Sequence, residues 1–191
     1  EMKFEKALQL NQISFSYEGS KQKVLNNIDL EIKKGSFTGV MGVSGIGKST
    51  LMDVLLGVLE PNSGNVTVDS IDIKNNLRSW QNQLGYVPQN IFLSDSTIRK
   101  NIAFGIKEEE INEEALKQSL KIAALDDFIA KLPEGLNTYV GEGGTRLSGG
   151  QRQRIGIARA FYHDPSLLVL DEALNAVDLE TENKIINSIK A

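Results

Sequence analysis

Apolar and polar residues alternate along much of the first third of the chain, which predicts short strands. The alternation is clearest over residues 8–15, 28–32 and 66–73. A short apolar run at residues 37–41 predicts a further strand, which ends at a glycine. The N-terminal third is therefore expected to contain a sheet of short strands.

Helical spacing begins near residue 48, where apolar positions through residue 58 share one helix face. Residues 95–131 are charged and rich in helix-favouring side chains, which indicates a helical insertion. Two more helices are expected over about 150–162 and 179–190, and the unbroken apolar run at 167–170 predicts a strand buried on both faces. Because strands alternate with helices at both ends, the expected class is α/β with a mainly parallel sheet.

Composition narrows the function classes. The 191 residues allow one ordinary domain or two small ones, and 40% hydrophobic with 24% charged residues excludes disorder. A net charge of −4 gives no sign of a basic nucleic-acid face. The absence of cysteine and the single histidine, His163, exclude disulfides, thiolate metal sites and multi-histidine zinc sites. No apolar stretch reaches the roughly 20 residues of a membrane span.

A glycine-rich segment carries the first chemical signal. Residues 42–49 read Gly-Val-Ser-Gly-Ile-Gly-Lys-Ser and fit the phosphate-loop pattern G-x-x-x-x-G-K-[ST]. Its glycines let backbone N–H groups approach phosphate oxygens, while Lys48 supplies a cation and Ser49 a hydroxyl for Mg²⁺. An ordinary glycine-rich turn with a solvated lysine is the alternative, and the expected flanking strand and helix favour the phosphate site.

Two acids follow the apolar run at 167–170. Asp171 and Glu172 would lie at the carboxyl end of that strand, where ligands bind in open α/β sheets. Asp171 would hold Mg²⁺ through water, and Glu172 could polarise an attacking water. Alone, such a pair is as easily a solvated turn, so the phosphate loop is what makes it significant.

A second helix N-terminus is predicted where Ser148 precedes two glycines, since serine is a preferred N-cap and glycine permits close backbone approach. The start of this helix could receive an anion, although an ordinary capped helix is the alternative. The segment consists of Leu147, Ser148, Gly149, Gly150 and Gln151.

The phosphate loop, Leu-Ser-Gly-Gly-Gln and the Asp-Glu strand end, in this order, resemble the nucleotide-binding domain of an ABC transporter over essentially the whole chain. The resemblance implies a P-loop ATPase core with a mainly parallel sheet, an N-terminal antiparallel β subdomain and an inserted α-helical subdomain. One ABC ATP-binding domain at 1–191 is expected, divided into a β subdomain with the phosphate loop (1–92), a helical subdomain with the signature (93–155) and the second part of the core (156–191).

The resemblance also assigns roles to single residues. Glu172 and Gln89 would be catalytic, and Ser49, Gln89 and Asp171 would hold Mg²⁺, the last through water. Tyr17 would stack on adenine, although an ordinary strand tyrosine is nearly as good a reading of that residue alone. The implied ATP-binding residues are Tyr17, Gly42, Val43, Ser44, Gly45, Ile46, Gly47, Lys48, Ser49 and Thr50.

Further implications concern partners. In this family the signature of one protomer covers the ATP of another, so residues 147–151 would act on a second nucleotide-binding domain in a homodimer or heterodimer. Asn175 and Asp178 match the dimer loop, with Asn175 in place of the usual Ser. A transmembrane domain is the other implied partner, and no nucleic acid is expected.

Residues 96–105 and 138–144 resemble exporter-type domains, and the rest is similar to bacterial lipid and lipid-linked oligosaccharide flippases. Tyr139 and Gly143 depart from the exporter loop, which usually has Glu and Arg there. The resemblance implies ATP hydrolysis coupled to export at the cytoplasmic face of the inner membrane. The family's switch histidine is not matched by His163, so the chain is expected to be truncated and to hydrolyse ATP slowly.

Three alternatives remain at this level: a soluble ABC-type ATPase acting on DNA or ribosomes, the ATPase subunit of an importer, and a nucleotide-gated regulator without turnover. Repair enzymes of the first kind carry a long coiled coil between the two motif-bearing halves, for which the spacing here leaves no room. Glu172 argues against the regulator, because degenerate sites in this family usually lose that acid.

Overall fold

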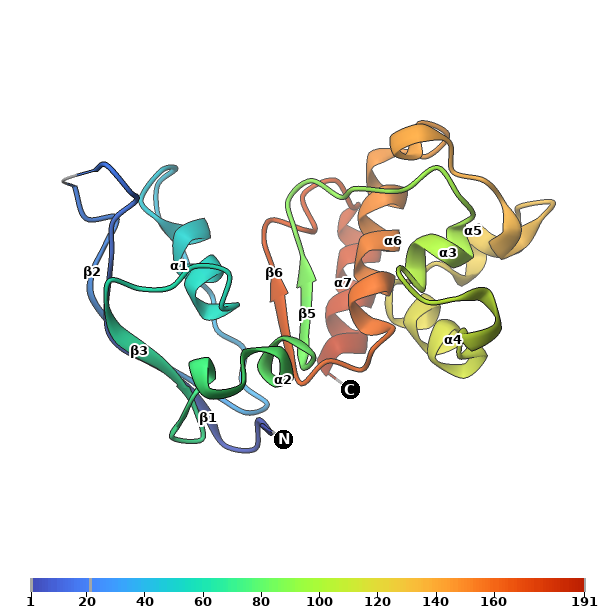
Figure 1. Ribbon diagram of the computed structural model, residues 1–191. Helices are drawn as coiled ribbons and strands as arrows, with labels where there is room; N and C mark the ends of the chain where they lie inside the picture. The colour runs from blue at the N-terminus through green and yellow to red at the C-terminus, as the bar shows by residue number, and fades with distance from the viewer. Residues whose placement is uncertain (1, 21, 191) are drawn as a thin grey trace. The chain divides into compact units, whose positions relative to one another are not determined.

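The computed structural model describes residues 2–20 and 22–190, and the chain divides into two compact units, Glu1–Leu84 and Gly85–Ala191. In Figure 1 the first unit runs from blue to green and the second from green to red. Within the described residues no helix is long and apolar enough to cross a membrane. The expected division at 92 and 155 remains a prediction about subdomains.

The first unit is built on a four-stranded antiparallel sheet in the order β2-β1-β3-β4. Its strands are β1 (Ala7–Phe15), β2 (Leu25–Lys33), β3 (Ser63–Val68) and β4 (Ile71–Asp72). Central β1 places Leu8 opposite both Ile32 and Val68, and all three side chains are buried. This sheet is the antiparallel N-terminal element that the alternating pattern and the family resemblance predict.

Three helices complete this unit: α1 (Lys48–Leu55), the 3₁₀ turn η1 (Ile73–Asn76) and α2 (Leu77–Gln81). Trp80 on α2 is fully buried, and its indole N–H donates to the carbonyl of Leu55 over 3.0 Å. The helix expected to continue to Val58 ends earlier, because Gly57 adopts a left-handed conformation with φ +71° that an α-helix cannot continue through.

Residues 37–41, expected to form a strand before the phosphate loop, do not form one. Phe37 is 65% exposed and Met41 95% exposed. A strand requires a neighbouring ladder for its backbone groups, and the four strands of this unit pair only among themselves. The apolar run is therefore present without the hydrogen bonds that would make it a strand.

The second unit is mainly helical around a two-stranded sheet of β5 (Leu84–Val87) and β6 (Leu167–Leu170). The two arrows point the same way in Figure 1, as the α/β prediction requires. Its helices are α3 (Ile98–Ile102), η2 (Glu108–Glu110), α4 (Glu113–Ile122), α5 (Asp126–Ala130), η3 (Gly135–Asn137), η4 (Glu142–Gly144), α6 (Gly149–Phe161) and α7 (Leu179–Lys190). The helical insertion and both later helices are thus confirmed.

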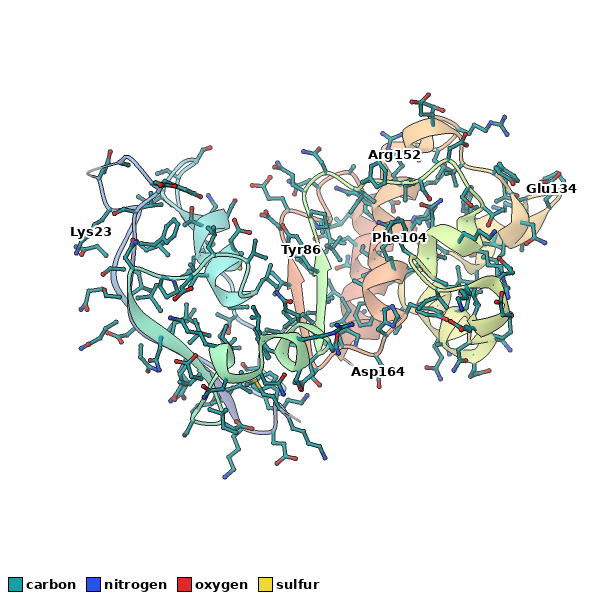
Figure 2. All side chains as sticks on the ribbon, viewed as in Figure 1. Lys23, Tyr86, Phe104, Glu134, Arg152 and Asp164 are labelled. Atoms are coloured by element: carbon teal, nitrogen blue, oxygen red, sulfur yellow. The ribbon has the colours of Figure 1, made fainter. Side chains whose placement is uncertain are left out.

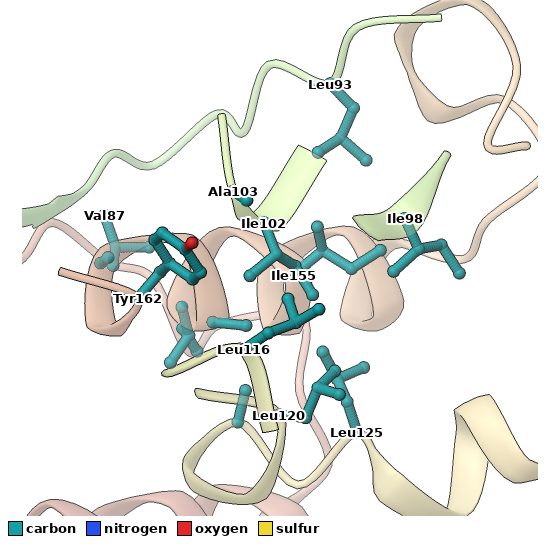
Figure 3. Packing of buried hydrophobic residues seen from close by; sticks show 14 of the residues in the cluster. Val87, Leu93, Ile98, Ile102, Ala103, Leu116, Leu120, Leu125, Ile155 and Tyr162 are labelled. Carbon is teal, nitrogen blue, oxygen red and sulfur yellow. The ribbon is translucent and has the colours of Figure 1, made fainter. Parts of the chain in front are cut away.

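Helix α6 is the centre of this unit's core. Ile155 and Ile157 are fully buried, and α3 and α4 pack against the helix (Figure 3). From α4, Leu116 and Leu120 enter the same cluster. A Cβ at Gly156 would come within 2.5 Å of the Ile91 side chain, so this position must be glycine for the helix to lie close to the segment after β5. The core therefore holds α6 against the other elements of this unit.

Strand β6 is less buried than its sequence predicts. Val169 is the buried residue of the strand, whereas Leu170 is 37% exposed. In the part of the chain that the structure describes, β6 has one strand neighbour, β5. A strand buried on both faces needs covering layers on each side, and the apolar run alone does not supply them.

Candidate nucleotide-binding and hydrolytic site

The phosphate-loop segment leads into helix α1 through two glycines in left-handed conformations, Gly45 (φ +78°) and Gly47 (φ +105°). Gly47 is the N-cap and makes no side-chain capping hydrogen bond. A Cβ there would approach the Val24 side chain to 2.9 Å and its carbonyl oxygen to 3.1 Å. The first-turn N–H groups of α1 are therefore not satisfied by a capping side chain, and such a helix start suits an anion.

Lys48 folds back over this loop. Its Nζ donates hydrogen bonds to the carbonyl oxygens of Gly42, over 2.9 Å, and Val43, over 3.1 Å. Both acceptors are neutral carbonyl groups, so neither of these hydrogen bonds cancels the charge of the ammonium group. The loop thus holds a positive charge beside the start of α1, where a polyphosphate would need it.

Two neighbouring hydroxyls on α1 differ in their surroundings. Ser49 is exposed, whereas Thr50 is buried and its Oγ1 shares a 3.0 Å hydrogen bond with the hydroxyl of Tyr17. The Tyr17 ring also packs edge-to-face on Phe15 at 5.0 Å, yet the residue remains 48% exposed. Tyr17 is therefore fixed at its tip and edge while keeping surface available for a planar ligand.

The donor set of this loop fits a magnesium nucleotide. The loop glycines and the uncapped helix start offer backbone N–H groups, and Lys48 offers an ammonium group. Both kinds of donor suit the negatively charged oxygens of phosphates. The described residues contain no cluster of three or more His, Cys, Asp or Glu that could hold a metal alone. Mg²⁺ commonly keeps waters and binds through few protein groups plus substrate phosphates, so the exposed hydroxyl of Ser49 is a suitable ligand.

In the second unit, the ends of the two parallel strands bring Gln89 and Glu172 together. Gln89 lies two residues after β5 and Glu172 two residues after β6, and the Asp171 N–H donates to Val87 O over 3.0 Å. Gln89 Nε2–H donates to Glu172 Oε2 over 2.9 Å. Glu172 itself has φ +49°, an uncommon conformation for a non-glycine residue that turns the chain sharply at this point.

Helix α6 begins as the sequence predicts. The Gln151 N–H donates to Ser148 Oγ over 3.2 Å, and the Ser148 N–H donates to Gln151 Oε1 over 2.8 Å, which is a complete capping box. A Cβ at Gly150 would approach the carbonyl oxygen of Ala176 to 2.7 Å. Glycine at this position therefore allows the dimer-loop segment 175–178 to lie against the start of α6.

A hollow within the second unit lies between these two segments. Gln153 holds the loop, since its Oε1 accepts the Ala176 N–H over 2.9 Å. Asp178 caps α7 by accepting the Thr181 N–H over 3.0 Å. Hydrogen bonding to Thr181 lowers the pKa of Asp178, and the charge of Arg154 adds to the effect. Burial lowers the pKa of Arg154. The hollow is lined by Ser148, Gly149, Gly150, Gln151, Arg154, Ala176, Val177 and Asp178.

The expected site residues thus form local groups in the two units. Tyr17, Thr50, Lys48 and the loop glycines lie in the first unit, and the signature, Gln89, Glu172, Asn175 and Asp178 lie in the second. The predicted magnesium ligands are divided between the units, so their joint site remains a prediction. Sequence reasoning missed Gln153 and Arg154. The burial of the Gln153 amide on α6 is seen only in the structure and gives no signal in the sequence.

The comparisons with known proteins agree with this chemistry. A phosphate loop before a helix, with an acid after an apolar strand, is typical of a P-loop nucleotide-binding protein. The family model for the ABC transporter matches residues 25–175, and the chain belongs to that family. It is accordingly an ABC-type ATP-binding domain, and its fold is that of the ATP-binding part of an ABC exporter.

Named relatives are exporters and a flippase. The chain is 41% identical over 186 residues, 96% of its length, to a putative export ATP-binding/permease protein of Rickettsia bellii, covering 32% of that protein. It is 38% identical to an ATP-dependent lipid A-core flippase of Desulfotalea psychrophila, covering 98% of this chain and 32% of the relative. A bacterial Atm1-family ABC exporter with ATP bound superposes with a TM-score of 0.90 at 35% identity, over 97% of this chain and 32% of that one. The chain therefore spans about a third of the length of these relatives.

Proposed function

We propose that this chain is the ATP-hydrolysing motor domain of an exporter-type ABC transporter. The observation that carries the proposal is the pairing of Gln89 with Glu172 where two parallel strands end, in a chain that also has a phosphate loop and an ABC signature. An acid held there by an amide has the chemistry of a general base. The similarity to named exporters supports the transport assignment.

ATP binding would rest on the first unit. The N–H groups at the start of α1 and the Lys48 ammonium would bind the phosphates, and Tyr17 would stack on the adenine. Ser49 would ligate Mg²⁺, with Gln89 and Asp171 as further ligands, the latter through water. When bound, the metal neutralises charge on the phosphate oxygens.

Hydrolysis would depend on Glu172. Its carboxylate accepts a proton from the attacking water as the water approaches the terminal phosphate, and Gln89 keeps the carboxylate oriented. We further propose slow turnover by these 191 residues. Their histidine, His163, packs its ring on Tyr162 and does not match the family's switch histidine. A site that works without one transition-state donor loses roughly 10²–10³-fold in rate.

The signature would act on the nucleotide of a second nucleotide-binding domain. Gly149 and Gly150 place backbone N–H groups at the start of α6, in the hollow that also contains Arg154. A helix start with a nearby arginine suits a phosphate supplied from outside the chain. The second domain can be another copy or a related chain.

The other proposed partner is a transmembrane domain, which would place this chain at the cytoplasmic face of the inner membrane. Four large aromatic side chains of the second unit are exposed, of which Figure 2 labels the first and third: Tyr86, Phe92, Phe104 and Tyr139. Tyr139 belongs to the loop expected to touch the membrane domain. Lipid or lipid-linked saccharide is the proposed cargo, on the similarity to the lipid A-core flippase.

The decisive experiment is Glu172→Gln. We expect the variant to bind ATP with unchanged affinity, to lose hydrolysis by about 10³-fold and to dimerise with ATP and Mg²⁺. Glu109→Gln, an exposed acid on η2, is the matched control and should behave as the unchanged chain. Light scattering at saturating ATP that finds only monomer argues against the dimer, and undiminished hydrolysis removes Glu172 from the chemistry.

A further inference from the structure

The carboxylate of Glu172 receives a second hydrogen bond besides the one from Gln89. Asn175 lies three residues later, and its Nδ2–H donates to Glu172 Oε2 over 3.1 Å. Gln89 donates to the same oxygen over 2.9 Å. Among the described residues no hydrogen bond reaches Oε1, so both amides hold the same oxygen and leave the other without a protein donor on an exposed residue.

The backbone explains how Asn175 reaches this carboxylate. The left-handed conformation of Glu172 begins a tight turn, closed by the Asn175 N–H donating to the Glu172 carbonyl over 3.3 Å. The turn brings the Asn175 amide back to the side chain of Glu172. A serine, the residue usual in the family at this place, is one bond shorter and would not extend as far.

We propose that Asn175 is a positioning residue for Glu172: with Gln89, it fixes Oε2 so that Oε1 is directed at the attacking water. The inference rests on the proposed hydrolytic function, since a fixed carboxylate matters only if Glu172 acts as the base. Although Asn175 is exposed, its amide donates to Glu172 instead of bonding only to water. Asn175 therefore contributes to turnover within its own chain, apart from any contact across a dimer.

Three substitutions at Asn175 separate positioning from a merely structural role. Serine keeps a donor, alanine has none, and aspartate replaces the donor with a second carboxylate beside Glu172. Positioning predicts that kcat for ATP hydrolysis falls in the order Ser, Ala, Asp, by about tenfold for Asn175→Ala and further for Asn175→Asp, with the KM for ATP within twofold. If Asn175 only stabilised the turn, Asn175→Asp would retain more kcat than Asn175→Ala, because aspartate supports such turns and alanine does not.

The experiment measures kcat, KM and melting temperature for the unchanged chain and these three variants, and repeats Asn175→Ala with Glu172→Gln already present. We expect the added substitution to cost nothing in that background, because Asn175 acts through Glu172. Any of three results overturns the inference. The first is a smaller loss of kcat for Asn175→Asp than for Asn175→Ala, and the second is a raised KM with unchanged kcat. The third is the same tenfold loss of kcat when Asn175→Ala is added to Glu172→Gln. If Glu172→Gln alone leaves kcat intact, it is the proposed hydrolytic function that fails, and the two failures are thereby distinguished.

Discussion

The phosphate loop and the Glu172 turn, both of which we propose act on ATP, differ in what shapes them. The loop in the first unit is shaped by backbone: glycines with positive φ, a helix start without a side-chain cap, and a lysine resting on carbonyl oxygens. The turn in the second unit is shaped by side chains, with two amides converging on one carboxylate. Under the proposed function, the loop would recognise the charge of the phosphates, and the turn would direct one carboxylate oxygen at the attacking water. Binding and chemistry should therefore be separable by mutation.

The largest expected effect on ATP binding is that of removing the Lys48 side chain. Lys48→Ala removes the cation that would contact the phosphates, and charge-assisted hydrogen bonds of this kind predict a loss in ATP affinity of about 10²-fold. Lys48→Arg retains the charge and should lose less. A nucleotide titration by calorimetry measures both, and equal affinity for the alanine variant and the unchanged chain would reject the role of Lys48.

The next largest effect is on stability and concerns the signature, where Gly150 lies close to the backbone of Ala176. Gly150→Ala places a Cβ 2.7 Å from the Ala176 carbonyl oxygen, so the loop or the helix must shift; we expect a loss in stability of about 1–3 kcal/mol. Gly149→Ala is the matched control, because its Cβ would meet Ala176 at an ordinary 3.5 Å. Urea unfolding of the two variants should differ clearly, and identical midpoints would show that the contact is not tight.

A smaller effect concerns pH in the first unit. Asp69 accepts hydrogen bonds from the N–H groups of Glu5, Lys6 and Ala7. Burial opposes the charge of Asp69, but these three bonds outweigh it and lower the pKa of its carboxyl. Because the folded pKa lies below the unfolded value of about 3.9, the stabilisation is present above that pH and is lost as pH falls through the folded pKa. Urea midpoints measured downward from pH 6 should fall less steeply for Asp69→Asn than for the unchanged chain, and parallel curves would contradict the assignment.

The smallest expected effect tests whether Tyr17 binds by its ring or its hydroxyl. Tyr17→Phe removes the bond to Thr50 but keeps the aromatic face, so ATP affinity should fall by about threefold or less. Tyr17→Ala removes the aromatic face as well, so its ATP affinity should fall further. Fluorescent-nucleotide binding measures both, and equal losses for the two variants would place the contribution in the hydroxyl instead.

Local pattern predicted the parts of the fold that depend on local chemistry. The alternation at 8–15 and 28–32 became paired strands, and α7 spans the predicted 179–190. The N-cap at Ser148 was predicted from the sequence, and the structure adds that Gln151, three residues later, completes a capping box. The run at 37–41 was predicted wrongly, since a strand depends on a neighbour that the run itself does not encode.

The site shows the same division. Motif pattern indicated Lys48 and Glu172, and the family resemblance assigned Gln89. Neither could show that Gln89 and Glu172 touch, because 83 residues separate them. The bond from Asn175 to Glu172 was missed for another reason. It depends on a left-handed conformation at Glu172, which no sequence rule assigns to a glutamate.

The central claim is that the loop binds ATP while Glu172 turns it over, and a crossed measurement on two variants tests it most directly. ATP affinity and hydrolysis rate are measured for Lys48→Ala and Glu172→Gln under the same conditions, with hydrolysis read at nucleotide concentrations well above each dissociation constant. The account predicts that Lys48→Ala loses affinity and that Glu172→Gln keeps affinity while losing turnover. A Glu172→Gln variant that binds ATP as weakly as Lys48→Ala, or that hydrolyses it at the original rate, would contradict the account.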